Sequence, residues 1–135
     1  MRAPLAILLC LALACGSPTE PSPTLQFEGQ VVFGIPTLPI TAQALDGGIK
    51  VSGVISTPTA EYTLTGHIRA GGGNKLVLDV VVDKTQTGAP FPVQNYYEGR
   101  IGNLSSGNYD LEVNHTLHIT TPQTATVFHG VVHVP

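Results

Sequence analysis

The chain has 135 residues, of which 42% are hydrophobic and 11% are charged, and its formal net charge is -3 at pH 7. This length is enough for one packed domain and too short for two. The six Lys and Arg residues are scattered, which excludes the basic patch of a nucleic-acid-binding protein. The 15 Gly and 11 Pro residues favour short strands joined by turns over helices.

Residues 1–14 are typical of a secretory signal peptide. Arg2 supplies the positive start, and an apolar run from Leu5 to Leu13 follows that is too short to cross a bilayer as a helix. Ala12-Leu13-Ala14 satisfies the small-x-small rule for cleavage in ordinary secretion, and the next residue is Cys15.

The sequence Leu11-Ala-Leu-Ala-Cys15 also resembles a bacterial lipobox, although Ala12 stands where the commonest pattern has Leu. The resemblance implies that Cys15 is diacylated and becomes the new N-terminus, so that the protein is anchored by lipid in the bacterial envelope. Gly16 after the cysteine, in place of Asp, resembles the pattern that sorts lipoproteins to the outer membrane. The alternative is a secreted or periplasmic soluble protein in which Cys15 lies at the cleavage site by chance.

Residues 15–24 fit an extended tether between the membrane and a folded domain, because they contain three prolines and no residue that would pack. Cys10 would leave with the signal peptide and Cys15 would carry the lipid, so the mature domain would contain no thiol. We therefore expect no disulfide and no cofactor other than the covalent lipid on Cys15.

Residues 25–135 read as a chain of short strands with a turn every eight to twelve residues. The break at Asp46-Gly-Gly48 is one of the strongest hairpin signals, and residues 84–92 form the longest irregular link. The expected strands cover residues 25–33, 40–45, 49–55, 62–68, 76–82, 93–101, 109–119 and 125–134. The fold class this predicts is an all-β, single antiparallel β-sandwich of seven or eight strands.

Leu104, Gly107 and Tyr109 form a structural corner before the longest alternating segment, which ends at Ile119. Their pattern, Leu-x-x-Gly-x-Tyr, resembles the corner of immunoglobulin-like and fibronectin-III-like β-sandwiches. The resemblance implies that the Tyr109 hydroxyl bonds back to the upstream backbone and latches the crossover between sheets. The spacing is one residue shorter than in fibronectin domains, and the absence of a Cys-Trp-Cys core excludes an antibody-type domain.

Nearly the whole mature chain resembles a group of small bacterial lipoproteins. The resemblance rests on the Gly-Ser-Pro-Thr linker, a Thr-Pro-Thr turn before Tyr62, the Gly-x-Tyr corner and a last strand that ends in Val-x-Val-Pro. It implies an envelope location and a β-sandwich, and it implies no activity.

Tyr96, Tyr97 and Arg100 are the residues that we would choose for contact with a partner, because Tyr and Arg give large contact area at a low cost in entropy. Consecutive residues of a strand point to opposite faces, so one of the two tyrosines should be in the core. Phe91, between two prolines in the long link, is a candidate to join the exposed tyrosine.

Five histidines raise the alternative of a metal-binding envelope protein. A four-residue loop that pairs Thr121 with Thr126 would place His118 opposite His129 on the outward face. A shift of two residues would instead place Glu112 opposite His133. Zinc requires three or four ligands, so either pair alone is more typical of a solvated contact than of a metal site.

Two pairs of carboxylates, Asp79 with Asp83 and Asp110 with Glu112, share a face at about 7 Å, a separation compatible with acid-base hydrolysis of a sugar. No aromatic platform accompanies them, and no serine lies in a Gly-x-Ser-x-Gly motif. We therefore expect a non-catalytic binding or structural module that contacts another envelope protein or a glycan, with a small carbohydrate-active hydrolase as the weakest alternative.

Overall fold

The computed structural model describes residues 21–85, 91–118 and 121–135. The signal peptide, the lipobox with Cys15 and the first part of the linker lie outside the described residues. The described chain forms eight strands and no helix. They are β1 (Thr24–Val32), β2 (Thr41–Leu45), β3 (Gly48–Thr57), β4 (Tyr62–Ala70), β5 (Lys75–Lys84), β6 (Val93–Gly102), β7 (Gly107–His118) and β8 (Pro122–Val134).

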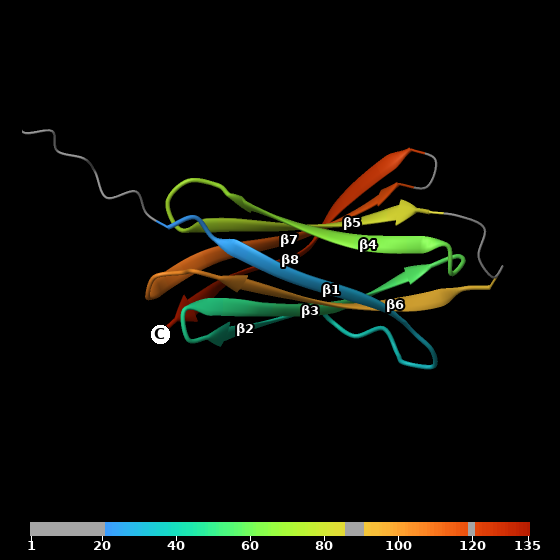
Figure 1. Ribbon diagram of the computed structural model, residues 1–135, viewed down its shortest axis with the longest axis horizontal. Helices are drawn as coiled ribbons and strands as arrows, with labels where there is room; N and C mark the ends of the chain where they lie inside the picture. Colours follow the sequence, from blue (N-terminus) through green and yellow to red (C-terminus); the bar gives the residue numbers. More distant parts are fainter. Residues whose placement is uncertain (1–20, 86–90, 119–120) are drawn as a thin grey trace, which may run out of the picture.

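The eight strands form two four-stranded sheets that face each other as a sandwich (Figure 1). The orders are β1-β6-β3-β2, here called sheet A, and β4-β5-β7-β8, here called sheet B. The predicted all-β sandwich is confirmed, and each expected strand is present with ends that differ by up to three residues. The immunoglobulin-like assignment stays a prediction.

One strand pair departs from the predicted antiparallel arrangement. β5 and β7 run parallel, with Lys75 beside Asp110 and Val82 beside Leu117, so the prediction was wrong for this pair. The reason is the path of the chain, because β6 lies between β5 and β7 in the sequence but belongs to the other sheet. β5 and β7 therefore start from the same end of the molecule.

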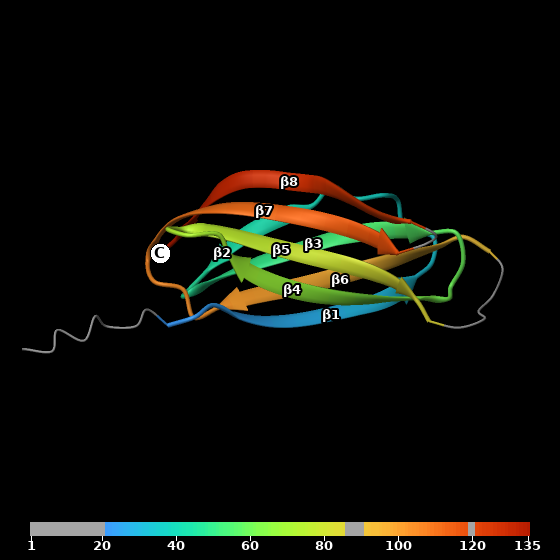
Figure 2. The same ribbon diagram turned by 90° about the horizontal axis from the view of Figure 1, so that it is seen from above.

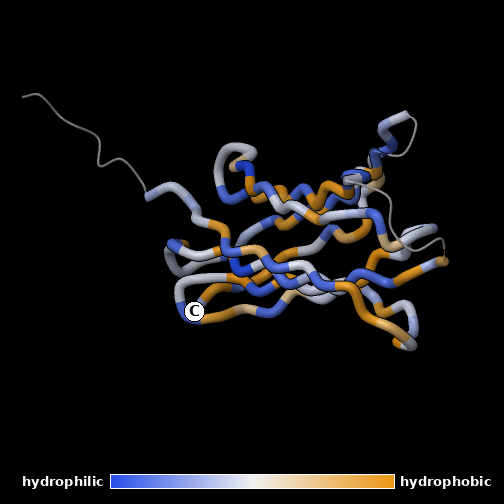
Figure 3. Tube along the Cα trace, turned by 45° about the vertical axis from the view of Figure 1, so that its right-hand side comes forward, coloured by the Kyte–Doolittle hydropathy of each residue, from blue (hydrophilic) through white to orange (hydrophobic). Residues whose placement is uncertain are grey.

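The strands alternate hydrophobic and hydrophilic residues, as the tube in Figure 3 shows, and their apolar faces meet between the sheets. Burying one such side chain contributes about 1.5–3 kcal/mol. The fully buried residues with the largest side chains are Tyr97, Ile49, Leu78, Ile101, Leu111, Val51, Val80, Val82, Val113 and Val134.

Two glycines within strands make room for aromatic rings in this core. A Cβ atom on Gly66 would collide with the ring of Phe27, and one on Gly53 would lie 2.7 Å from the Tyr97 hydroxyl oxygen. The two rings stack with their centroids 5.7 Å apart. Gly53 and Gly66 are therefore spacers that let Phe27 and Tyr97 fill the middle of the sandwich.

The two ends of the sandwich differ in how the chain turns (Figures 1 and 2). At the end where β1 begins, here called the tether end, tight turns join β2 to β3, β4 to β5 and β6 to β7, and the C-terminus lies at the same end. At the opposite end, here called the far end, β1, β3, β5 and β7 end. Within the described residues no helix is long and apolar enough to cross a membrane.

Candidate functional site

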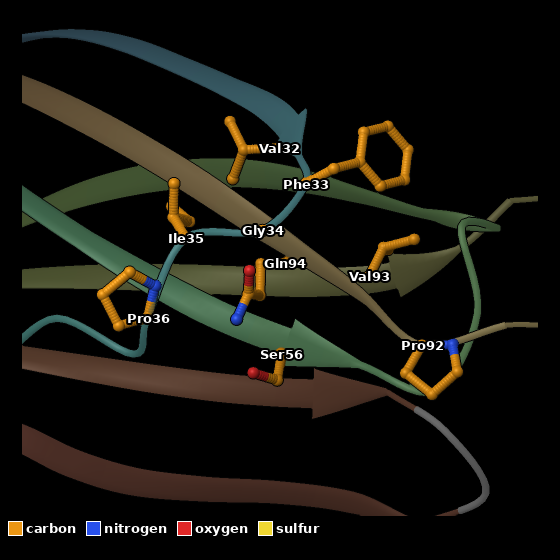
Figure 4. Close-up of a pocket in the computed structure, with 9 residues that line it drawn as sticks. All are labelled: Val32, Phe33, Gly34, Ile35, Pro36, Ser56, Pro92, Val93 and Gln94. Atoms are coloured by element: carbon orange, nitrogen blue, oxygen red, sulfur yellow. The ribbon is translucent and has the colours of Figure 1, made fainter.

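A hollow of the described surface lies at the far end, on the outer side of sheet A. After β1 the chain crosses from one edge of this sheet to the other, because β1 and β2 are its two edge strands. The crossing segment, with the ends of β3 and β6, encloses a groove of about 590 Å³ (Figure 4). The groove is lined by Val32, Phe33, Gly34, Ile35, Pro36, Ser56, Pro92, Val93 and Gln94.

Two aromatic rings stand exposed at this groove. Phe33 is 69% exposed, and Phe91, next to the lining residue Pro92, is 46% exposed. Their ring centroids are 6.4 Å apart with the planes tilted by 47°. Leu38 of the crossing segment is a further exposed apolar side chain, at 46%. Large apolar side chains gathered at a surface mark contact sites more often than scattered ones do.

The floor of the groove is polar. Ser56 of β3 and Gln94 of β6 are direct neighbours in the sheet, and both face outward. Neither side chain has a hydrogen-bond partner within the described part of the chain. A mostly apolar hollow with a few convergent polar groups is the usual composition of a binding site.

The predicted contact residues Tyr96 and Arg100 lie on the same outer face, nearer the middle and the tether end. Both are tied to Glu98, whose carboxylate accepts hydrogen bonds from the Tyr96 hydroxyl at 3.4 Å and the Arg100 Nε at 2.9 Å. Lys50 Nζ of β3 lies 3.0 Å from the same carboxylate. The hydrogen bonds from Lys50 and Arg100 lower the pKa of Glu98.

Tyr97 is not available to a partner, because its side chain is fully buried between the sheets. Its hydroxyl lies 2.9 Å from Nε2 of His115, and both groups are in the core. Burial lowers the pKa of His115 from 6.5 to about 4 and raises the pKa of the Tyr97 hydroxyl above its ordinary value. Tyr97 therefore leaves the predicted contact set, and Tyr96 is the outward-facing member of the pair.

The predicted corner lies at the tether end, away from the groove. The Tyr109 hydroxyl donates a hydrogen bond of 3.0 Å to the carbonyl oxygen of Ser105. The Leu104 side chain packs against the core, and its N–H donates to the Gly47 carbonyl at 3.0 Å. Gly107 has a φ of 152°, a conformation that L-residues rarely adopt. These contacts tie the β6–β7 turn to the β2–β3 turn.

The two histidines proposed as a metal pair are not opposite each other, so both predicted registers of β8 were wrong. His118 pairs with Pro122, and His129 pairs with Glu112. The pairing shifts between Val113 and Asn114, where Val127 bulges out of the ladder. Each histidine contacts its own carboxylate, with His118 Nδ1 2.6 Å from Asp83 and His129 Nε2 2.7 Å from Asp110.

The other carboxylates of interest also lie on the outer face of sheet B and are paired there. Asp79 accepts hydrogen bonds from Arg69 at 2.6 Å and from Asn114 at 3.2 Å, and the bond from Arg69 is the main cause of its lowered pKa. Glu112 is bound by Asn114 and Lys75. Among the described residues, no three His, Cys, Asp or Glu side chains lie close enough to hold a metal ion.

The residues that form the walls of the groove were not among the predicted site residues. Phe33 was expected as the end of the strand at residues 25–33, and Ile35 and Pro36 fall between two expected strands. The sequence carried one signal for them. Bulky apolar residues continue beyond the strand between prolines, and a loop that only faces solvent does not need such residues. Phe91, a candidate to join the exposed tyrosine, is 46% exposed and lies beside Phe33, and its contact with a partner stays a prediction.

No known protein family, no curated protein and no solved structure matches this chain.

Proposed function

We propose that this protein is a lipid-anchored, non-catalytic binding module of the bacterial envelope, which uses the groove at its far end to bind an apolar segment of another envelope protein. The observation that carries the proposal is the pair of exposed rings, Phe33 and Phe91, beside a groove of about 590 Å³. Leaving both rings in water is unfavourable unless a partner covers them.

The position of the groove suits a tethered module. The linker enters at the tether end, and the groove lies at the opposite end of the sandwich (Figure 1). A lipid on Cys15 followed by the proline-containing linker would hold the tether end near the outer membrane and present the groove away from it. The mass of the mature protein from membranes tests the anchor, because an unmodified Cys15 thiol would contradict it.

The composition of the groove favours a protein segment over a glycan. Its walls are aliphatic and aromatic, and only Ser56 and Gln94 offer polar groups on its floor. A glycan would need more hydrogen-bonding side chains, since its surface is covered with hydroxyls. A non-catalytic role is supported by the placement of the carboxylates and exposed histidines, which are paired with neighbours on sheet B rather than gathered at the groove.

An immunoglobulin-like identity for the sandwich is part of the same proposal. It is supported by the hydrogen bond from Tyr109 to Ser105, the kind of bond that the corner resemblance implies.

Site-specific photocross-linking in intact cells tests the partner. A photoreactive phenylalanine analogue at position 33 or 91 of the full chain should give a covalent adduct with one protein of the envelope. The matched control carries the analogue at Thr65, an exposed position on the outer face of sheet B. Adducts from positions 33 and 91 that are no stronger than those from position 65 would contradict the proposal.

A second variant shows whether the rings themselves carry the binding. Phe33→Ser combined with Phe91→Ser should abolish capture through an analogue placed at Pro36, and Tyr96→Phe should leave that capture unchanged. Capture that survives the double substitution would show that the groove is not the binding site. Capture of a glycan instead of a protein would likewise overturn the choice of partner.

A further inference from the structure

Strand β8 is a long edge strand without the usual protection against pairing. It is the last strand of sheet B, so one side of its backbone has no strand partner within the described residues. Its 13 residues include no Asp, Glu, Lys or Arg, and its only proline is the first residue, Pro122. Soluble proteins usually place charges or prolines on such edges because an open edge is a template for another strand.

The other three edges of the sandwich are protected. β1 carries Glu28 and β4 carries Arg69, and these two edges approach each other closely. A Cβ atom on Gly29 of β1 would lie 3.1 Å from the Cβ of Leu64 in β4. The fourth edge, β2, is only five residues long. β8 also lies beside β2, but among the described edges it is the one long strand without a charged residue.

The hydrogen bonds of β7 show which backbone groups of β8 face the open side. The N–H of Asp110 donates to the Asn74 carbonyl at 2.9 Å, toward β5 and away from β8. Val131 is the residue of β8 directly opposite Asp110. In an antiparallel pair the two opposed residues both point toward each other or both point away, so the N–H and C=O of Val131 face the open edge. Because every second residue of a strand points its N–H and C=O to the same side, those of His129 and His133 also face the open edge.

The outward-facing residues of this edge, His129, Val131 and His133, can pair with the same three residues of a second copy. If two copies of β8 pair antiparallel about Val131, the exposed Val131 side chain, which is 71% exposed, meets the partner's Val131. His129 of each copy then lies opposite His133 of the other, on either side of this contact. Each of these pairs would exchange two backbone hydrogen bonds, because their free N–H and C=O groups face one another.

The inward row fits the same register. Phe128 would lie beside the partner's Val134, and Gly130 beside the partner's Val132. Gly130 keeps this row free of crowding, because a Cβ atom there would lie 3.2 Å from the Phe128 ring. The bulge at Val127 ends the regular ladder, so the pairing extends over Phe128–Val134.

We infer that two copies of this chain associate through the edge of β8, forming a continuous eight-stranded sheet about a two-fold axis at Val131. Such an interface is isologous, since each copy contributes the same strand. Strand pairing over a short stretch buries less than a standard interface, so the dimer should be concentration-dependent.

The arrangement agrees with anchoring of both copies in one membrane, a point that depends on the proposed lipid anchor. Val131 lies in the part of β8 that ends at the tether end, where the C-terminus and the linker are also found (Figure 1). β1, where the linker enters, lies at the edge of the sandwich opposite β8 (Figure 2), so the two linkers would leave the dimer on opposite sides of its two-fold axis, and the two grooves would point in opposite directions along the dimer. Anchoring in one membrane would raise the effective concentration of the second copy.

Substitutions at Val131 test the dimer because its backbone amide takes no part in the ladder with β7. Val131→Pro removes the amide that faces the open edge and should leave the monomer folded, as edge prolines do. Val131→Lys places a charge at the two-fold axis, and Val131→Thr is the matched control that keeps a β-branched side chain and the amide. Native mass spectrometry of the full-length lipidated protein should give the mass of two chains for the wild type and Val131→Thr, and of one chain for Val131→Lys and Val131→Pro.

Amide hydrogen exchange locates the interface residue by residue. In the dimer the amides of His129, Val131 and His133 should exchange slowly, and in Val131→Lys they should exchange rapidly. The amides of Gly130 and Val132 face β7 and should stay slow in both proteins, which controls for unfolding. A single-chain wild type with rapid exchange at Val131, or a dimer that persists in Val131→Lys, would overturn the inference. Phe33→Ser should leave the dimer intact, so this test is independent of the groove.

Discussion

The two halves of the sandwich differ in what they bury. In the tether half, the core between Ile49, Ile101 and Leu111 is purely apolar. The β6–β7 turn is held there by the bond from Tyr109 to Ser105 and is linked to the β2–β3 turn by the bond from the Leu104 N–H to the Gly47 carbonyl. The core of the far half adds buried polar groups. There the Tyr97 hydroxyl contacts His115, and the amide of Asn95 donates to the Thr57 hydroxyl at 3.0 Å.

This difference indicates that one half of the sandwich provides stability and the other half provides the contact surface. Buried polar pairs give little net stability, and they cost free energy if they are broken, whereas apolar burial contributes steadily. The far half also carries the segment that crosses from β1 to β2, the exposed rings and the groove. We interpret the tether half as the part that holds the fold and the far half as the part that meets a partner, since departures from the best packing concentrate at functional sites.

The largest loss of stability should come from truncating a core side chain in the tether half. Leu111→Ala removes a fully buried side chain and should lower the free energy of unfolding by about 2–5 kcal/mol, through lost burial and the cavity that remains. Leu38→Ala makes the same chemical change at a residue that is 46% exposed in the far half, and it should cost less than about 0.5 kcal/mol. Denaturant unfolding of both variants measures the contrast, and equal losses would break the comparison.

Lowering the pH should reduce the free energy of unfolding through His115, which lies in the far half. Burial lowers the pKa of His115 to about 4 in the folded protein, against an ordinary value of 6.5. As the pH falls below 6.5, His115 becomes protonated in the unfolded chain but stays neutral in the folded protein. The free energy of unfolding therefore declines until the pH reaches about 4. The shift corresponds to a loss of about 3 kcal/mol, measured by denaturant unfolding across this pH window.

A double substitution isolates this contribution. His115→Leu combined with Tyr97→Phe replaces both polar partners with apolar ones, so no buried donor or acceptor is left unpaired. The double variant should show a flatter dependence of stability on pH between 6.5 and 4 than the wild type. The same slope in both proteins would mean that other groups, and not His115, govern the acid sensitivity.

The strands could be predicted from the sequence because the signals for them are local. Alternation along most strands, a β-rich composition along the others and turn signals such as Asp46-Gly-Gly48 predicted seven or eight strands, and the hairpin between β2 and β3 follows that turn. The parallel pairing of β5 with β7 could not be predicted, since it depends on which sheet β6 joins. The pairing of His118 with His129 failed because the hairpin was placed too late in the chain. Thr121 was expected to pair with Thr126, but β7 ends at His118 and β8 already begins at Pro122, directly opposite it.

The candidate site was harder to predict than the fold for the same reason. The groove joins the segment after β1 to the ends of β3 and β6, which are far apart in the sequence. Tyr96 and Tyr97 illustrate the limit at a single residue. The alternation requires that one of them is buried, but the choice depends on Gly53, in the neighbouring strand, which leaves the space that the Tyr97 ring fills.

The smallest effect should come from the corner of the tether half. Tyr109→Phe removes the hydroxyl that donates to the Ser105 carbonyl and should lower the free energy of unfolding by about 1 kcal/mol, the typical net value of one hydrogen bond. Tyr96→Phe is the matched control, because its hydroxyl makes only a long bond of 3.4 Å to Glu98 on the outer face, and it should cost less than about 0.5 kcal/mol. Denaturant unfolding resolves the two variants. If Tyr109→Phe were as mild as Tyr96→Phe, the corner would not stabilise the β6–β7 turn, and the stability of the tether half would have to be assigned to its apolar core alone.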